Sequence, residues 1–368
     1  MRLSKIDWPI LVIVLLLALL GVIMVFSTTA VTGLNDYGDP HYFVKKQLLF
    51  LVLGIAALIG GFYVDYRHYK QVAFYGVLAS IVLLVLTLIP GIGIKSGGAR
   101  RWLDLGVFQL QSVELVKFAV AVFLSAALAR KQQVIHHFKQ GLLPILLIMA
   151  IPVLLISQQP DLGNIILIMA VMGLLFWVGR VPIIQLASLF FGAVMLVVVS
   201  LLFNPYQWKR IAAFLDPWAD PLGQNYHVIQ SFIAIGSGGI LGHGFGNSKL
   251  KFFYLPLHYS DFIFSVICEE GGLLLGLIVV LLFVALLVRS CILAKDIDDP
   301  FGYFLVMALT LFLVVQAVLN ISVVIGLLPV TGIPLTFISY GGSSYVISLF
   351  FVGVVLNVLA SAPRSSAS

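Results

Sequence analysis

About ten long apolar runs, each near the length that a helix needs to cross a hydrocarbon core, follow one another between Pro9 and Ala360. One long polar interruption, approximately residues 204–261, separates the seventh run from the eighth. The 368 residues are 61% hydrophobic and 10% charged, with a mean hydropathy of +1.12. A soluble core of this size needs a polar surface that 15 acidic and 21 basic side chains cannot supply. The sequence therefore predicts an all-α polytopic integral membrane protein.

An even number of spans places both termini on the same side, and the basic residues near the span ends favour the cytoplasmic side. We therefore expect both termini in the cytoplasm, a large extracytoplasmic loop at 204–261 and a short cytoplasmic tail at 361–368. The first run is long for a signal peptide, so we interpret it as a retained span of a single domain, 1–368. The expected spans are 9–28, 48–64, 72–90, 112–129, 143–157, 163–179, 183–203, 262–288, 302–326 and 336–360.

Cysteines and net charge exclude two classes of function. Cys268 and Cys291 both lie in or beside an apolar run, which leaves no disulfide framework and no zinc-ligand set. The net charge of +6 comes from bases scattered among the loops, without a dense run that alternates with aromatic residues. We expect no nucleic-acid partner.

Two adjacent bases, Arg100 and Arg101, follow a pair of glycines and precede the polar start of a span. Paired guanidiniums beside glycines suit a phosphate or pyrophosphate, although arginines and a tryptophan also anchor helices at the membrane interface. Glu114 and Lys117 are three residues apart on the following predicted helix, where they can neutralise each other. That pair is consistent with either a structural or a functional role.

Two further polar stretches lie at the ends of spans. Asp161 follows a proline at a predicted helix start, so it is either an N-cap or part of a site. Residues 226–235 predict a partly apolar helix on the bilayer surface. The glycine-rich stretch 236–248, which includes Ser237, lacks phosphate-loop spacing and is weak as a nucleotide site.

Asp261 stands where the long loop enters the eighth span. A carboxylate at this depth is expected to have a raised pKa, because desolvation disfavours its charged form, and that suits a general base working near neutrality.

Glu269 and Glu270 lie two turns further along the same predicted span and need partners, for which Lys117, Arg100 and Arg101 are the candidates. A role in helix packing is the alternative for this pair. Residues 328–344 predict a re-entrant turn and a small-residue packing surface at the start of the last span.

Taken in order, these stretches resemble the SEDS family of peptidoglycan polymerases, and its cell-division branch (FtsW) more than its elongation branch (RodA). The resemblance covers nearly the whole chain. Its most specific pieces are Gly-Ala-Arg-Arg-Trp at 98–102, Gln-Pro-Asp-Leu-Gly at 159–163, Phe-Leu-Asp-Pro-Trp-Ala-Asp-Pro-Leu-Gly at 214–223, Asp-Phe-Ile-Phe at 261–264 and Gly-Leu-Leu-Pro-Val-Thr-Gly at 326–332.

The resemblance implies a ten-span glycosyltransferase that polymerises lipid II on the outer face of the cytoplasmic membrane. It implies that Asp261 is the catalytic base, which deprotonates the acceptor 4-hydroxyl. It also implies a cognate class B penicillin-binding protein and other divisome proteins as partners. The residues that it assigns to substrate binding or to the central cavity are Arg100, Arg101, Glu114, Lys117, Asp161, Lys209, Arg210, Ser237 and Glu270.

One departure from the family pattern lies four residues before the predicted base. The acid that usually follows Leu-Pro is replaced by Leu257, and the histidine is displaced by one, to His258. This change removes either a like charge or a cation ligand beside Asp261, so a divalent cation, Mg²⁺ or Mn²⁺, remains only a candidate cofactor. Two other functions stay open, a lipid II flippase and a non-catalytic divisome scaffold.

Overall fold

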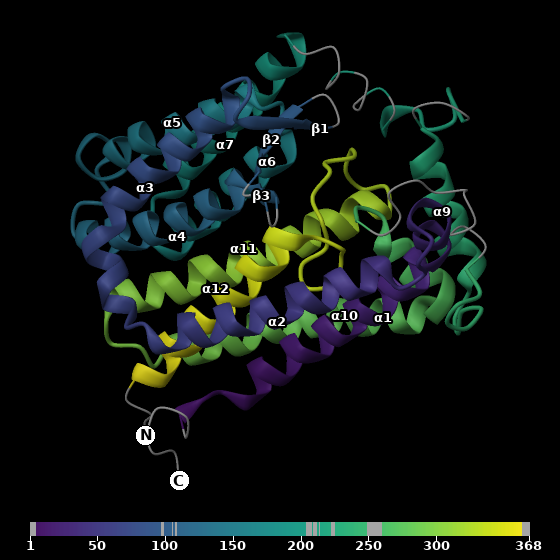
Figure 1. Cartoon of the computed structure of the whole chain (residues 1–368). Coiled ribbons are helices and arrows are strands. Elements are labelled where there is room, and N and C mark those ends of the chain that lie inside the picture. The colour runs from purple at the N-terminus through teal and green to yellow at the C-terminus, as the bar shows by residue number, and fades with distance from the viewer. Residues whose placement is uncertain are drawn as a thin grey trace.

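The computed structural model describes residues 5–96, 99–104, 106, 109–203, 208, 212, 214–221, 225–248 and 260–362. Most of them are helical, as predicted, and the long helices run roughly side by side in one bundle (Figure 1). The helices are α1 (Trp8–Tyr37), α2 (Tyr42–Tyr63), α3 (Tyr66–Leu88), α4 (Ser112–Lys131), the π-helix η2 (Phe138–Leu142), α5 (Leu143–Gln158), α6 (Leu162–Val178), α7 (Ile183–Phe203), α9 (Tyr226–Gly238), α10 (Ile263–Ala294), α11 (Pro300–Val324) and α12 (Gly342–Ser361).

Each predicted span overlaps one of these helices, so the fold class is confirmed. Within the described residues, eight helices are long and apolar enough to cross a membrane. The helix α6 has 17 residues, and the described apolar part of α7 is Ile183–Gly192, so both fall below that length. The number of spans and the side on which the 204–261 loop lies therefore remain predictions.

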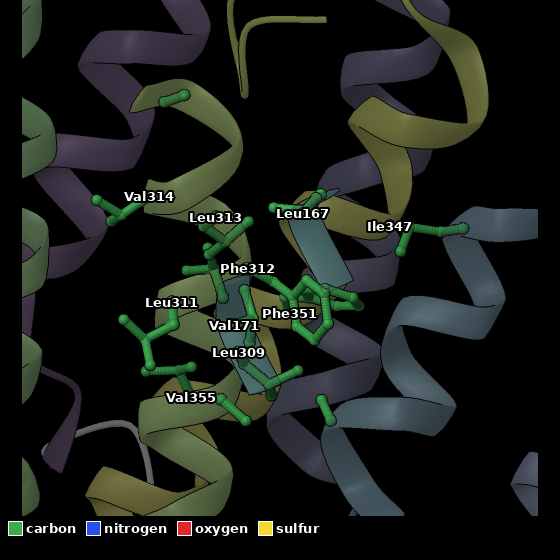
Figure 2. Packing of buried hydrophobic residues seen from close by; sticks show 14 of the residues in the cluster. Leu167, Val171, Leu309, Leu311, Phe312, Leu313, Val314, Ile347, Phe351 and Val355 are labelled. Carbon is green, nitrogen blue, oxygen red and sulfur yellow. The ribbon is translucent and has the colours of Figure 1, made fainter. Parts of the chain in front are cut away.

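The most deeply buried helices are α4, α11 and α12, which are surrounded by other helices on most sides and form the centre of the bundle. Figure 2 shows side chains from α6, α11 and α12, among them Leu167, Phe312 and Phe351, packed together in this core. The helix α2 lies along α12, and Gly353 makes that close approach possible, because a Cβ there would clash with the Leu58 backbone. The start of α1 and the end of α12 lie at the same end of the bundle (Figure 1).

A small antiparallel sheet, which the sequence did not predict, joins α3 to α4. Its strands are β1 (Gly93–Ser96), β2 (Ala99–Asp104) and β3 (Gln109–Gln111), in the order β1-β2-β3. Trp102 pairs with Ile94 on one side and with Gln111 on the other. Successive side chains of a strand point to opposite faces, so Arg100 and Arg101 face different neighbours.

Residues 325–341, which we call the re-entrant segment, return into the bundle between α11 and α12 without forming a helix. The backbone at Phe337 lies against Gly21 of α1, and the backbone at Thr331 lies against Gly163 of α6; an added Cβ at either glycine would come within 2.6 and 2.7 Å of a carbonyl oxygen. This agrees with the predicted re-entrant turn. It also corrects the last span, because residues 336–341 are not part of α12.

The helix α10 is interrupted at Gly272, whose φ of 68° and ψ of −175° are not helical. The glycine-rich stretch after α9 pairs with the exposed backbone on both sides of this break. The amides of His243 and Gly244 donate to the carbonyls of Glu269 and Glu270 at 3.0 and 2.9 Å, and the Leu273 amide donates to Gly239 at 2.9 Å. The glycines of this stretch therefore permit close docking on α10.

Candidate functional site

Asp261 lies immediately before α10, half-buried, between α11 and the re-entrant segment. The side-chain amide of Asn320 donates to the Asp261 carbonyl at 2.8 Å. The hydroxyl of Ser339 donates to the preceding carbonyl, that of Ser260, at 2.5 Å. The carboxylate points toward Gly332, where an added Cβ would lie 3.7 Å from Asp261 Oδ2. Two elements therefore fix the backbone that carries this carboxylate.

Two amide side chains of α11, Gln316 and Asn320, connect this helix to the re-entrant segment. Asn320 Nδ2 donates to the Ile333 carbonyl at 2.8 Å, and Gln316 Nε2 donates to the Pro334 carbonyl at 3.1 Å. Both side chains are buried. The sequence reasoning missed them, although two amides four residues apart in an apolar span mark one polar face of a helix.

Glu114 and Lys117 form the predicted ion pair on α4, with 2.7 Å between Glu114 Oε2 and Lys117 Nζ. Each residue is only 2% exposed, so the charges depend on each other for compensation. Lys117 Nζ also donates to Gln316 Oε1 at 2.8 Å. The pair therefore joins α4 to the same face of α11 that holds the backbone of Asp261.

Asp161 caps α6, which is one of the two roles that the sequence left open, with Oδ1 accepting from the Asn164 amide at 3.3 Å. Arg101 Nε lies 3.7 Å from the other carboxylate oxygen. The Arg101 guanidinium also donates to the carbonyls of Gln159 and Pro160, at 3.2 and 2.5 Å. Because α6 begins against Thr331 at Gly163, Asp161 and Arg101 lie beside the re-entrant segment.

The structure does not bring the two adjacent arginines together. Arg100 donates instead to the Leu88 carbonyl of α3, at 3.4 Å. Ser237 lies at the end of α9, where its hydroxyl donates to the Ala234 carbonyl at 3.0 Å. Lys209, Arg210, Leu257 and His258 lie outside the described residues.

The two adjacent glutamates of α10 are buried beside α1 and the docked glycine-rich stretch. Ser27 donates to both carboxylate oxygens of Glu270, at 2.6 and 2.8 Å, and the Ser248 amide donates to Oε1 at 3.4 Å. The Ser248 hydroxyl donates to Glu269. The expected partners bind elsewhere: Lys117 is bound to Glu114, Arg101 lies beside Asp161, and Arg100 donates to the Leu88 carbonyl.

The described part of the chain contains no cluster of metal-ligating side chains. Within it, no group of three or more His, Cys, Asp or Glu side chains could hold a metal ion.

The arrangement combines the half-buried carboxylate of Asp261, whose backbone two elements hold, with the guanidinium of Arg101 beside the same re-entrant segment. A carboxylate held rigidly in this way suits proton abstraction, and a guanidinium suits the developing charge of an anionic leaving group. The fold and this site define a polytopic membrane protein whose polar groups gather around a re-entrant segment. The chain belongs to the cell cycle protein family of FtsW, RodA and SpoVE, whose model matches residues 7–363.

Curated relatives match over nearly their whole length. The chain is 40% identical to the stage V sporulation protein E of Bacillus subtilis over 352 residues, which are 96% of each chain. It is 38% identical to the probable peptidoglycan glycosyltransferase FtsW of Geobacter metallireducens over 362 residues, covering 97% of this chain and 95% of that protein. The predicted family is confirmed.

Solved structures share the fold. A chain from a peptidoglycan synthase complex that coordinates polymerization and crosslinking is 31% identical, with a TM-score of 0.80, and the match covers 98% of this chain and 99% of that one. The rod shape determining protein RodA of Thermus thermophilus is 26% identical, with a TM-score of 0.71, and 96% of each chain is covered.

Proposed function

We propose that this chain is a peptidoglycan glycosyltransferase that polymerises lipid II into glycan strands, in septal cell-wall synthesis. The observation that carries the proposal is the Asp261 carboxylate, which faces Gly332 on a backbone held by Asn320. Relatives named probable peptidoglycan glycosyltransferase FtsW, and the likeness to a chain of a complex for polymerization and crosslinking, support it.

In this proposal Asp261 takes the proton from the 4-hydroxyl of the acceptor sugar. The oxygen then attacks the anomeric carbon of the donor chain, and the bond between that carbon and the pyrophosphate oxygen breaks. The electron pair leaves with undecaprenyl pyrophosphate, whose charge must be stabilised. A base in hydrogen-bonding reach of the hydroxyl and cations near the leaving group are what this reaction requires.

The cations differ in what they can contribute. The Lys117 side chain is 3% exposed and already paired with Glu114, so we assign it to holding Gln316 and, through α11, the Asp261 backbone. The Arg101 side chain is 19% exposed, and we assign it to the leaving group together with Lys209 and Arg210. Glu114 and Asp161 then serve to position their cationic partners.

The arrangement of the ends supports the proposed location, the cytoplasmic membrane with both termini in the cytoplasm. The start of α1 and the end of α12 share one end of the bundle, and the re-entrant segment lies toward the other (Figure 1). Asp261 would then face the outer leaflet, where lipid II is presented. We further propose that the chain works as one domain with a class B penicillin-binding protein and other divisome proteins.

Polymerisation of fluorescent lipid II by the purified chain, with and without its penicillin-binding partner, tests the function. We expect glycan ladders from the wild type and at least a hundredfold loss with Asp261→Asn, because the base is removed while the size of the side chain is kept. Asp39→Asn, which changes an exposed acid between α1 and α2, is the matched control and should retain activity.

Two other outcomes would support one of the alternative functions instead. Lipid translocation by the wild type, with no ladders even beside the partner, would indicate a flippase. Growth of a depletion strain on Asp261→Asn would indicate a scaffold.

A further inference from the structure

A groove lies between α3, α4 and α5, apart from the site around Asp261. Its volume is about 300 Å³, at the lower limit of small-molecule sites. The groove lies at the end of the bundle where α12 finishes, because Asn357 of α12 bonds to the carbonyl of Phe62 and to the amide of Tyr66, at the start of α3. Nothing in the proposed polymerase mechanism uses it.

The groove is basic at its mouth. Lys70 lies in the second turn of α3, and Arg130 and Lys131 lie in the last turn of α4. Lys131 Nζ is fixed by the carbonyls of Gln140 and Gly141, at 2.6 and 3.3 Å. Among the described residues Arg130 makes no ion pair, and no residue that lines the groove is acidic. Three positive charges at one opening attract an anionic occupant.

Deeper in the bundle the groove is apolar. Phe74 is one turn further into the bundle than Lys70, and Phe123 is seven residues, or about 10 Å, from Arg130. Ile148 lines the groove from α5, five residues after the start of that helix, and Phe74 is 56% exposed. Bases near the helix ends and an apolar wall toward the middle reproduce the order of headgroup and acyl chain in a phospholipid.

We propose that this groove binds an anionic phospholipid from the leaflet on the side of the two termini, with its phosphate at Arg130 and Lys70 and an acyl chain between α3 and α5. Arg130 supplies the planar pair of donors that a phosphate accepts, and Lys70 and Lys131 supply point charges. The site stands independently of the proposed polymerase activity, since it lies at the opposite end of the bundle from Asp261.

Native mass spectrometry of the purified full chain tests the proposal, with phosphatidylglycerol and phosphatidylcholine of identical acyl chains as probes. We expect the wild type to bind phosphatidylglycerol about 25-fold more tightly, since each of the two bases at the phosphate contributes a factor of about five. Lys70→Gln combined with Arg130→Gln should abolish this preference. Lys139→Gln removes an exposed base of η2 that does not line the groove, and it should keep the preference.

A second variant tests the acyl chain. Ala127 lines the groove, so Ala127→Leu should weaken the binding of both lipids severalfold, and Ala127→Ser, which scarcely changes the volume, should not. Equal binding of the two lipids by the wild type, or an unchanged preference in the double variant, would overturn the proposal. So would unchanged binding by Ala127→Leu, or full displacement of the lipid by inorganic phosphate at equal concentration. Neither Lys70 nor Arg130 is buried, so the variant that replaces both should fold and tests the proposal even if Ala127→Leu does not fold.

Discussion

The side-chain amide nitrogen of Asn320 donates to the carbonyls of both Asp261 and Ile333, at 2.8 Å each. One residue of α11 thus holds both the backbone of the proposed base and the re-entrant segment that its carboxylate faces. Asn320→Leu, which keeps the size but removes the donor, should lower the polymerisation rate by about a hundredfold, because a base displaced by about 1 Å loses that much. We expect the apparent affinity for lipid II to change little. Rate measurements at saturating and limiting lipid II separate the two quantities.

The matched control for Asn320 is Val318→Ala, on the exposed side of the same helix, where Val318 is 52% exposed. It should polymerise at the wild-type rate. Wild-type polymerisation by Asn320→Leu would show that the clamp on the Asp261 backbone has no part in the reaction.

His227 of α9 makes the fold sensitive to acid. Among the described residues its Nδ1 has no hydrogen-bond partner and is buried, its ring centre lies 6.2 Å from that of Phe262, and burial lowers its pKa from 6.5. The unfolded chain therefore takes up a proton near pH 6.5, where the folded chain does not, so stability falls as the pH drops from 7 to below 6. His227→Phe should flatten this dependence.

Thermal unfolding of the detergent-solubilised protein between pH 5.5 and 8 measures the effect of His227. The same change at the exposed His68 of α3 serves as the control and should leave the slope unaltered. An identical slope for the wild type and for His227→Phe would contradict the assignment of the acid sensitivity to this side chain.

At the scale of the element, the break in α10 requires glycine. Gly272 has a φ of 68° and a ψ of −175°, and a Cβ there would clash with the carbonyl of Ile240. Gly272→Ala should therefore cost about 1–3 kcal/mol of stability and expose residues 239–248 to limited proteolysis. Gly173→Ala is the control, because a Cβ there meets no atom within 4 Å. Equal melting temperatures and cleavage rates for the two variants would refute a docking role for Gly272.

At the scale of the whole molecule, hydropathy alone was enough to predict most of the bundle, because lipid and core select apolar residues alike. Hydropathy wrongly extended the last span over residues 336–341, because Phe337 and Ile338 of the re-entrant segment are apolar and buried like the residues of a span. Residue spacing along the chain predicted the pairing of Glu114 with Lys117, and it gave the Asp161 cap as one of two possible roles.

The remaining contacts of the site join residues far apart in the chain, which no local pattern reveals. Ser27 and Glu270 are 243 positions apart, and Lys117 and Gln316 are 199 apart. The sheet escaped prediction because its strands are short and polar, and because Arg100 and Arg101 suggested a ligand-binding loop. The assignment of the site residues to catalysis remains a prediction that the variants above test.

The re-entrant segment touches α1, α6, α11 and the residues before α10, and within the described part of the chain α12 is the one helix that follows it. Synthesis runs from the amino terminus, so every other wall of the site is inserted before this segment leaves the ribosome. A nascent or truncated chain that stops at residue 324 would therefore hold Asp261 with no Gly332 beside it. In the proposed function, a growing chain would thus complete its site only once the re-entrant segment has been made.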